Sequence, residues 1–150
     1  MLRQLVVGSV VSVGNIAIHA LVMMAVIEVA NIVAAMKTSH PIIRLALIMA
    51  ATVSVLMVAH VCEVMAWSLT YEAVDAVPEN SDLVYFAFVN YTTLGYGDVV
   101  PVERWRLLGP MTAMNGVLLF GWSTAVIFHV LLRAMSGTSA AIPSGSDAEE

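Results

Sequence analysis

Charged residues are scarce in this chain. Lysine, arginine, aspartate and glutamate make up only 11% of its 150 residues, whereas hydrophobic residues make up 60%. Soluble domains carry about 25% charged residues. The formal net charge of −5 also disfavours binding to nucleic acid, whose phosphates attract basic surfaces. The composition therefore argues against a soluble domain and predicts an integral membrane protein that contacts lipid and binds no nucleic acid.

Cysteine is nearly absent as well. The only cysteine, Cys62, lies within an apolar run, so the chain can form no internal disulfide and no cysteine-based metal site. Regularly spaced arginines are missing from the first apolar run, which excludes a voltage sensor there. We predict no enzymatic activity and no organic cofactor.

Three long apolar stretches dominate the rest of the sequence. Each exceeds the roughly 20 residues that a helix needs to cross a bilayer. The first is about twice as long as the core of a cleaved signal peptide, so we interpret it as a retained helix. The predicted spanning helices occupy an accessory segment at 1–36, residues 42–71 and residues 107–133.

A shorter apolar segment separates the second and third stretches. Ser81 is a plausible N-cap for a helix over residues 82–92, which is too short to span a bilayer and is typical of a re-entrant segment. Residues 72–82 carry four acidic and no basic residues, which would concentrate cations nearby. Small, polar and acidic residues fill positions 136–150, and this composition predicts a disordered tail.

Residues 93–98, TLGYGD, form a polar break after the short helix. Non-helical backbone at membrane depth is tolerated only where protein buries it or where it lines water. Glycine adopts positive φ freely, and Gly95 and Gly97 alternate with residues that carry side chains. Backbone of alternating handedness points successive carbonyl oxygens the same way. Four such segments around one axis would form rings of oxygen atoms that replace the water shell of a monovalent cation.

The groups around this break fit an oxygen-lined pore. The Thr93 hydroxyl would add one more ring of oxygens at the inner end, and Tyr96 would point away from the axis and pack behind it. The C-terminal end of the short helix carries partial negative charge, which stabilises a cation halfway across the membrane.

The segment TLGYGD resembles the selectivity filter of pore-loop potassium channels, whose usual form is T-[VI]-G-Y-G-D. The longer stretch FAFVNYTTLGYGDVVP is similar to that family's pore helix and filter, and the resemblance covers about residues 42–133. It implies an all-α membrane protein with three transmembrane helices, a re-entrant pore helix and a filter loop. The pore domain is then 37–135, and the residues that bind K⁺ in a homotetrameric filter are Thr93, Leu94, Gly95, Tyr96 and Gly97.

The resemblance also implies an orientation. In that family the filter lies near the outer face, which would place residues 72–82 and the N-terminus outside and the C-terminus in the cytoplasm. The six basic residues alone divide equally between the two sides and give no orientation. We expect the bacterial inner membrane, by resemblance.

The chain departs from the family pattern at three positions near the filter. Leu94 replaces the usual valine or isoleucine, and Val89 stands where some members have a glutamate that pairs with the filter aspartate. Tyr85 stands where many members have a tryptophan. We therefore expect the Tyr85 hydroxyl to bond Asp98, with Thr92 as further support for the filter.

Polar residues inside the second helix have two interpretations. His60 and Glu63 share one face with Trp67 and Tyr71. The pair would either titrate near neutral pH and gate the pore, or join the helix to the first helix or the pore helix. We favour the second interpretation, with Asn15 and His19 on the first helix as the other half of the contact.

The third helix carries further candidates. Gly116 and Gly121 would either bend this helix during gating, as in family members, or allow close helix packing. Asn115, Ser123 and Thr124 would line a wet cavity below the filter. His129, near the inner end, is a candidate sensor of cytosolic pH.

Three other functions stay open. A potassium transporter subunit would have a related pore loop, although such chains usually carry four pore repeats and this one has a single repeat. A channel relative that has lost conduction would act as a partner subunit. A membrane haem protein would ligate iron through two of His19, His60 and His129, but would leave the glycines of the filter unexplained.

Overall fold

The computed structural model describes residues 1–35 and 40–139, and its regular elements are all helical. The elements are α1 (Leu2–Ala34), α2 (Pro41–Ala73), α3 (Leu83–Tyr91), a short 3₁₀ turn η1 (Glu103–Trp105) and α4 (Leu108–Ser139). The predicted all-α class is confirmed.

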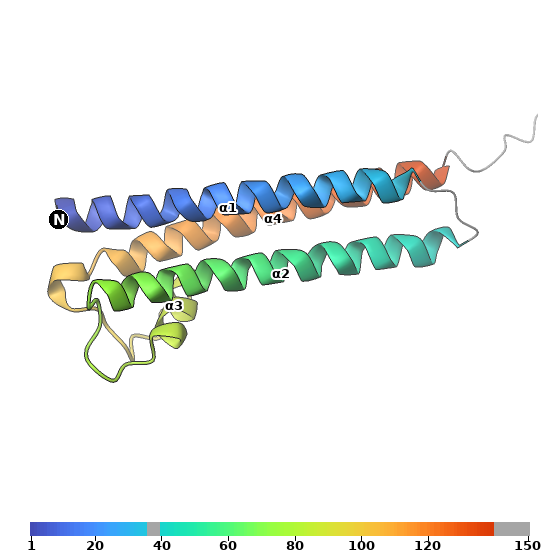
Figure 1. The fold of residues 1–150 in the computed structure, drawn as a ribbon. Helices are drawn as coiled ribbons and strands as arrows, with labels where there is room; N and C mark the ends of the chain where they lie inside the picture. The colour runs from blue at the N-terminus through green and yellow to red at the C-terminus, as the bar shows by residue number, and fades with distance from the viewer. Residues whose placement is uncertain (36–39, 140–150) are drawn as a thin grey trace, which may run out of the picture.

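The three long helices form one bundle (Figure 1). α1 packs against both α2 and α4, and α2 also packs against α4. Among the described residues, three segments are long and apolar enough to cross a membrane, as predicted: Leu2–Val33, Ile42–Ala73 and Glu103–Met135. Many large apolar side chains on these helices are exposed, which suits contact with lipid rather than water.

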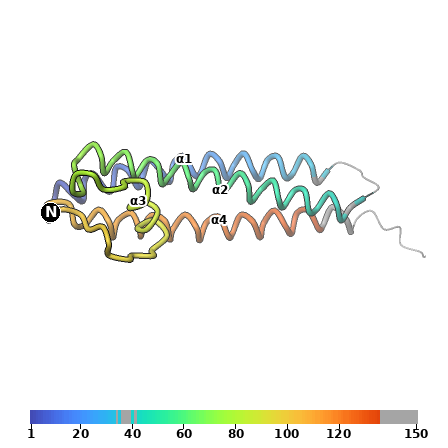
Figure 2. The backbone as a smooth tube through the Cα atoms, turned by 90° about the horizontal axis from the view of Figure 1, so that it is seen from below, coloured from blue at the N-terminus to red at the C-terminus, as the bar shows by residue number. Residues whose placement is uncertain are grey.

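The short helix α3 lies at the end of the bundle where the chain begins (Figures 1 and 2). It packs against α2 and α4. Its N-cap is Asp82, whose carboxylate accepts a hydrogen bond of 2.9 Å from the amide of Tyr85. The prediction of Ser81 as N-cap was therefore wrong by one residue, and a carboxylate at this position also interacts favourably with the helix dipole. The helix covers 83–91 rather than 82–92.

The other helix ends also differ from the predicted bounds. α2 continues to Ala73, and α4 begins at Leu108 and continues to Ser139. Residues 136–139, predicted as the start of a disordered tail, are helical, because each added residue gains a backbone hydrogen bond and no proline interrupts the run before Pro143. Met36 and the rest of the predicted tail lie outside the described residues.

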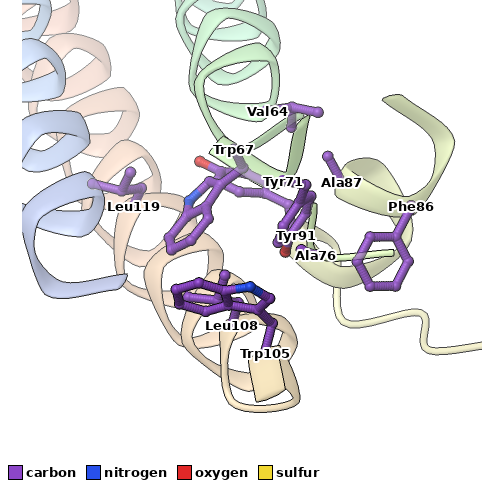
Figure 3. Close-up of a cluster of buried hydrophobic side chains, with 10 residues drawn as sticks. All are labelled: Val64, Trp67, Tyr71, Ala76, Phe86, Ala87, Tyr91, Trp105, Leu108 and Leu119. Atoms are coloured by element: carbon purple, nitrogen blue, oxygen red, sulfur yellow. The ribbon is translucent and has the colours of Figure 1, made fainter. Parts of the chain in front are cut away.

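An apolar cluster fixes α3 against the bundle (Figure 3). Trp67 and Tyr71 of α2 are fully buried in it, and Tyr91 at the end of α3 is buried beside them. The remaining members come from α2, α3, α4 and the connecting segments: Val64, Ala76, Phe86, Ala87, Trp105, Leu108 and Leu119. This packing holds the end of α3 in a fixed position.

A second apolar cluster joins α1, α2 and α4 in the other half of the bundle, and it includes Met23, Leu56 and Val130. Polar residues lie between the two clusters. On α4, Ser123 follows Leu119 of the first cluster and precedes Val126 of the second. The bundle is therefore built from two apolar layers that enclose one polar layer.

Gly116 allows α4 to approach the end of α3. A Cβ atom at Gly116 would lie 2.0 Å from the carbonyl oxygen of Tyr91, whereas a Cβ at Gly121 would meet nothing within 4 Å. Of the two interpretations, close packing applies to Gly116.

We predict that Gly116→Ala destabilises the protein by about 1–3 kcal/mol, because the added methyl group must displace backbone. Thermal unfolding followed by circular dichroism in detergent measures this change. Gly121→Ala is the matched control on the same helix, where alanine fits and favours the helix. Equal unfolding temperatures for the two variants would contradict the close contact at Gly116.

Candidate functional site

The non-helical segment 92–98 folds back onto the end of α3. The amides of Thr93, Leu94 and Gly95 donate hydrogen bonds to carbonyl oxygens of α3, with donor–acceptor distances of 2.9, 2.9 and 3.3 Å. The acceptors are the carbonyls of Asn90 and Val89. These contacts satisfy helix-terminal carbonyls that have no partner within α3.

The backbone of this segment alternates in handedness. Thr93, Gly95 and Gly97 have φ angles of 62°, 58° and 78°, whereas Leu94 and Tyr96 between them have no positive φ. Positive φ is rare for a β-branched residue such as threonine, and it persists only where the surroundings impose it. The alternation expected from the two glycines is present, and it extends to Thr93.

The same segment is open to the surroundings in a single chain. All residues from 92 to 98 are exposed, and Tyr96 and Leu94 expose 67% and 53% of their surface. The packing that we expected behind Tyr96 is therefore not made within one chain. At membrane depth, exposed non-helical backbone is tolerated only where other protein covers it or where it lines water.

A hydrogen bond from α3 holds the C-terminal end of the segment. The Tyr85 hydroxyl donates to Asp98 Oδ2 at 2.7 Å, so the bond expected from the sequence is present. This bond lowers the pKa of Asp98 below its usual range and raises the pKa of the Tyr85 hydroxyl. Val89, in the place of a glutamate, is buried in the protein instead. The Thr92 hydroxyl donates to the carbonyl of Phe88 at 2.7 Å.

The arrangement of helices and loop has a counterpart among known families. A family model described as an ion channel matches residues 45–133, which include most of α2, all of α3, the segment 92–98 and α4 as far as Arg133. The chain belongs to this pore-loop ion channel family. No curated protein and no solved structure matches the chain.

Membership makes this chain an integral membrane ion channel, and the family is not a family of enzymes. The match begins within α2 and leaves out α1. The first helix therefore lies outside the matched region.

At the end of the channel that carries α3, the acidic segment has a basic neighbour. Glu72, Asp75 and Glu79 line a polar hollow together with Arg104. In the sequence, residues 72–82 carry only acidic charges, and Arg104 comes later, after the segment 92–98. The fold brings Arg104 close to the acidic residues. The field that draws cations to this end is weakened accordingly.

A buried polar cluster connects α1, α2 and α3 of the channel. His19 Nδ1 lies 2.6 Å from Glu63 Oε1, and His60 Nδ1 lies 3.0 Å from Glu63 Oε2. The Tyr91 hydroxyl donates to Glu63 Oε2 and also lies 3.0 Å from His60 Nδ1. The contact predicted between His60 and Glu63 is present. His19 of α1 contacts the other oxygen of the same carboxylate, so the predicted link to the first helix is present as well.

Ser123 adds α4 to this cluster. Its hydroxyl oxygen lies 2.9 Å from His60 Nε2 and 3.2 Å from His19 Nε2, and the two imidazole rings have centroids 5.2 Å apart. Ser123 exposes 5% of its surface in this chain. The expectation that it faces a wet cavity is therefore wrong, because the hydroxyl is used between the two histidines.

Asn115 also bonds to other helices of the channel. Its Oδ1 accepts from Asn15 Nδ2 at 3.1 Å and from Trp67 Nε1 at 3.0 Å, and Asn15 Nδ2 reaches the Glu63 carbonyl at 3.3 Å. Asn115 is buried rather than lining a cavity. These bonds support the interpretation that polar side chains join the helices. Thr124, by contrast, is exposed and donates to the carbonyl of Phe120.

His129 does not belong to the cluster. It is exposed on another face of α4, whereas both nitrogens of His19 and of His60 have hydrogen-bond partners. The haem interpretation, which needed two free histidine nitrogens around iron, finds no support in this arrangement.

We predict that Tyr85→Phe raises the pKa of Asp98 towards its ordinary value of about 4, because the hydroxyl that stabilises the carboxylate is lost. Carboxyl carbon NMR measures this pKa. In the wild type, the stabilisation that this bond contributes is fully present at neutral pH. It is lost as the pH falls through the folded-state pKa of Asp98, which lies below the ordinary value. Ion flux through Tyr85→Phe should decay faster with time.

The matched variant is Tyr85→Trp, which keeps a hydrogen-bond donor at this position. It should retain the low Asp98 pKa. An unchanged pKa and an unchanged flux decay in Tyr85→Phe would mean that the bond has no importance for the channel.

Proposed function

We propose that this ion channel conducts K⁺ passively and selectively through a homotetrameric pore. The observation that carries the proposal is the alternating backbone of residues 93–97 in a segment that one chain leaves exposed. Carbonyl oxygens of Thr93, Leu94, Gly95 and Tyr96 would bind K⁺, and Gly97 would complete the filter. K⁺ would cross by moving between successive oxygen rings.

The position of α3 supports this proposal. The filter segment begins directly after the C-terminal end of α3, whose partial negative charge favours a nearby cation. Trp67, Tyr71 and Tyr91 fix that end against α2. A cation site of this kind needs no charged side chain among the ligands, because the backbone supplies the oxygens.

The exposure of the filter segment supports four copies. One chain supplies one strand of carbonyl oxygens, and a closed ring of copies around an axis would cover the exposed residues Leu94 and Tyr96. Each exposed backbone group would then face either the partner protein or the ion. A filter of this type is incomplete without the other copies.

We also propose an outer location for the filter, in the bacterial inner membrane. The N-terminus and α3 lie at the same end of the bundle (Figure 1), so both would face the outside. The C-terminal end of α4 would then face the cytoplasm.

Potassium flux into liposomes tests the function, with sodium as the control ion. The expected result is uptake of K⁺ that exceeds uptake of Na⁺ and that needs no energy source. Equal uptake of both ions would overturn potassium selectivity. A folded tetramer without flux at any pH or voltage would support a non-conducting partner subunit instead.

We predict that Gly97→Ala reduces K⁺ flux by about tenfold or more, since an L-residue at positive φ costs roughly 1–2 kcal/mol in each subunit. The matched control is Gly14→Ala on α1, where an added Cβ meets nothing within 4 Å. Gly14→Ala should conduct like the wild type. A K⁺ flux in Gly97→Ala equal to that of Gly14→Ala would contradict the proposed backbone filter.

A further inference from the structure

The buried cluster around Glu63 has more contacts than hydrogen atoms to fill them. Six close contacts join these groups: those of Glu63 with His19, His60 and Tyr91, those of Ser123 with the two histidines, and that of His60 Nδ1 with the Tyr91 hydroxyl. The last contact can share the hydrogen that His60 Nδ1 directs at Glu63, so the other five each need one hydrogen of their own. With Glu63 ionised and both histidines neutral, only four hydrogens are present, one each from His19, His60, Ser123 and Tyr91. One contact would then bring two lone pairs together.

A change of tautomer does not remove this shortage. If either imidazole carries its hydrogen on Nε2, its Nδ1 lone pair faces a carboxylate oxygen of Glu63 at 2.6 or 3.0 Å. If both carry it on Nδ1, the hydroxyl of Ser123 can donate to only one of the two Nε2 atoms. One additional proton at the cluster satisfies all five contacts, and it also balances the buried carboxylate charge.

A divalent metal ion fits the distances less well than a proton. His19, His60 and Glu63 have ligand atoms within 4.8 Å of one another. Zinc at about 2.0–2.1 Å from tetrahedral ligands would keep those ligands about 3.3 Å apart. The observed separations of 2.6 and 3.0 Å are hydrogen-bond lengths, so the arrangement is that of a shared proton.

We propose that His19, Glu63 and His60 bind one shared proton, and that this proton couples α1 to the pore helix through Tyr91. The carboxylate and one imidazolium give the cluster no net charge. Among the described residues, the titratable groups in these contacts are His19 from α1, His60 and Glu63 from α2 and Tyr91 from α3, and α4 contributes only the hydroxyl of Ser123.

The route from the proton to the pore is short. Tyr91 bonds Glu63 through its side chain, is the last residue of α3 and comes directly before the segment 92–98. Its carbonyl is also the atom against which Gly116 packs. Removal of the proton at high pH leaves one contact unfilled and a net negative charge beside Tyr91, which loosens the end of α3. This coupling to conduction rests on the proposed function, whereas the proton itself does not.

Nitrogen-15 NMR of the histidines in the full-length protein, in lipid nanodiscs at neutral pH, tests the proton. The expected spectrum contains one buried imidazole with hydrogens on both nitrogens. Glu63→Gln should abolish that signal, because the glutamine amide supplies the missing hydrogen itself. The control His129→Gln removes an exposed histidine and should leave the signal unchanged.

Two results would overturn the proton site. One is a spectrum in which both buried histidines are neutral. The other is stoichiometric zinc in the purified protein that Glu63→Gln loses, because it would show that a metal supplies the cation. Elution of each variant at the wild-type oligomer size shows that it has folded.

Flux measurements at about pH 7 and about pH 9 test the coupling. The ratio of K⁺ to Na⁺ flux should fall by about fivefold at the higher pH, the factor expected from one net hydrogen bond. Tyr91→Phe keeps the proton but removes the hydroxyl contact to Glu63, so its NMR signal should persist while its pH response disappears. A pH response in Tyr91→Phe equal to that of His129→Gln would overturn the coupling.

A wild-type protein without any flux would count against the proposed function, and the NMR result would still decide the proton site. In that case the rate of amide hydrogen exchange at residues 92–97 measures the coupling, because this experiment needs no ion flow. Exchange in Tyr91→Phe should be about fivefold faster than in His129→Gln. Equal exchange in the two variants would overturn the coupling there as well.

Discussion

Within a bilayer, polar groups have no water to bond and must find partners in the protein. The carboxylate of Glu63 meets this constraint with three helices, because His19 comes from α1, His60 from its own helix α2 and Tyr91 from α3. Ser123 extends the contacts to α4. A buried carboxylate without these partners would be costly, so the positions of the four helices depend on one another.

The apolar clusters on either side protect this polar layer. Trp67 and Tyr71 exclude lipid and water on the side of α3, and the cluster around Met23 and Val130 does so in the other half. Apolar packing alone is weakly directional in a membrane, because lipid tails are as apolar as leucine. The hydrogen bonds therefore specify how the helices are rotated, and the packing adds contact area.

The segment 93–97 meets the same constraint in a different way. Its amides near α3 bond to helix-terminal carbonyls, and its φ angles alternate in sign. In the proposed tetramer, copies of the chain and ions would complete the surroundings of this segment. The packed end of α3 therefore fixes where this segment begins.

The sequence by itself determined the three spanning helices, since their length and apolar composition follow from the thickness of the bilayer. It also determined the alternating backbone at Gly95 and Gly97, since this is a local property of glycine, and the bond of Tyr85 to Asp98 followed from the resemblance of neighbouring residues. Only the tertiary structure decided that Ser123 lies between two histidines, one of them 104 residues away, that Arg104 joins the acidic hollow and that His129 lies apart. The reason is that such partners depend on the rotation and depth of whole helices relative to one another, which no single helix encodes.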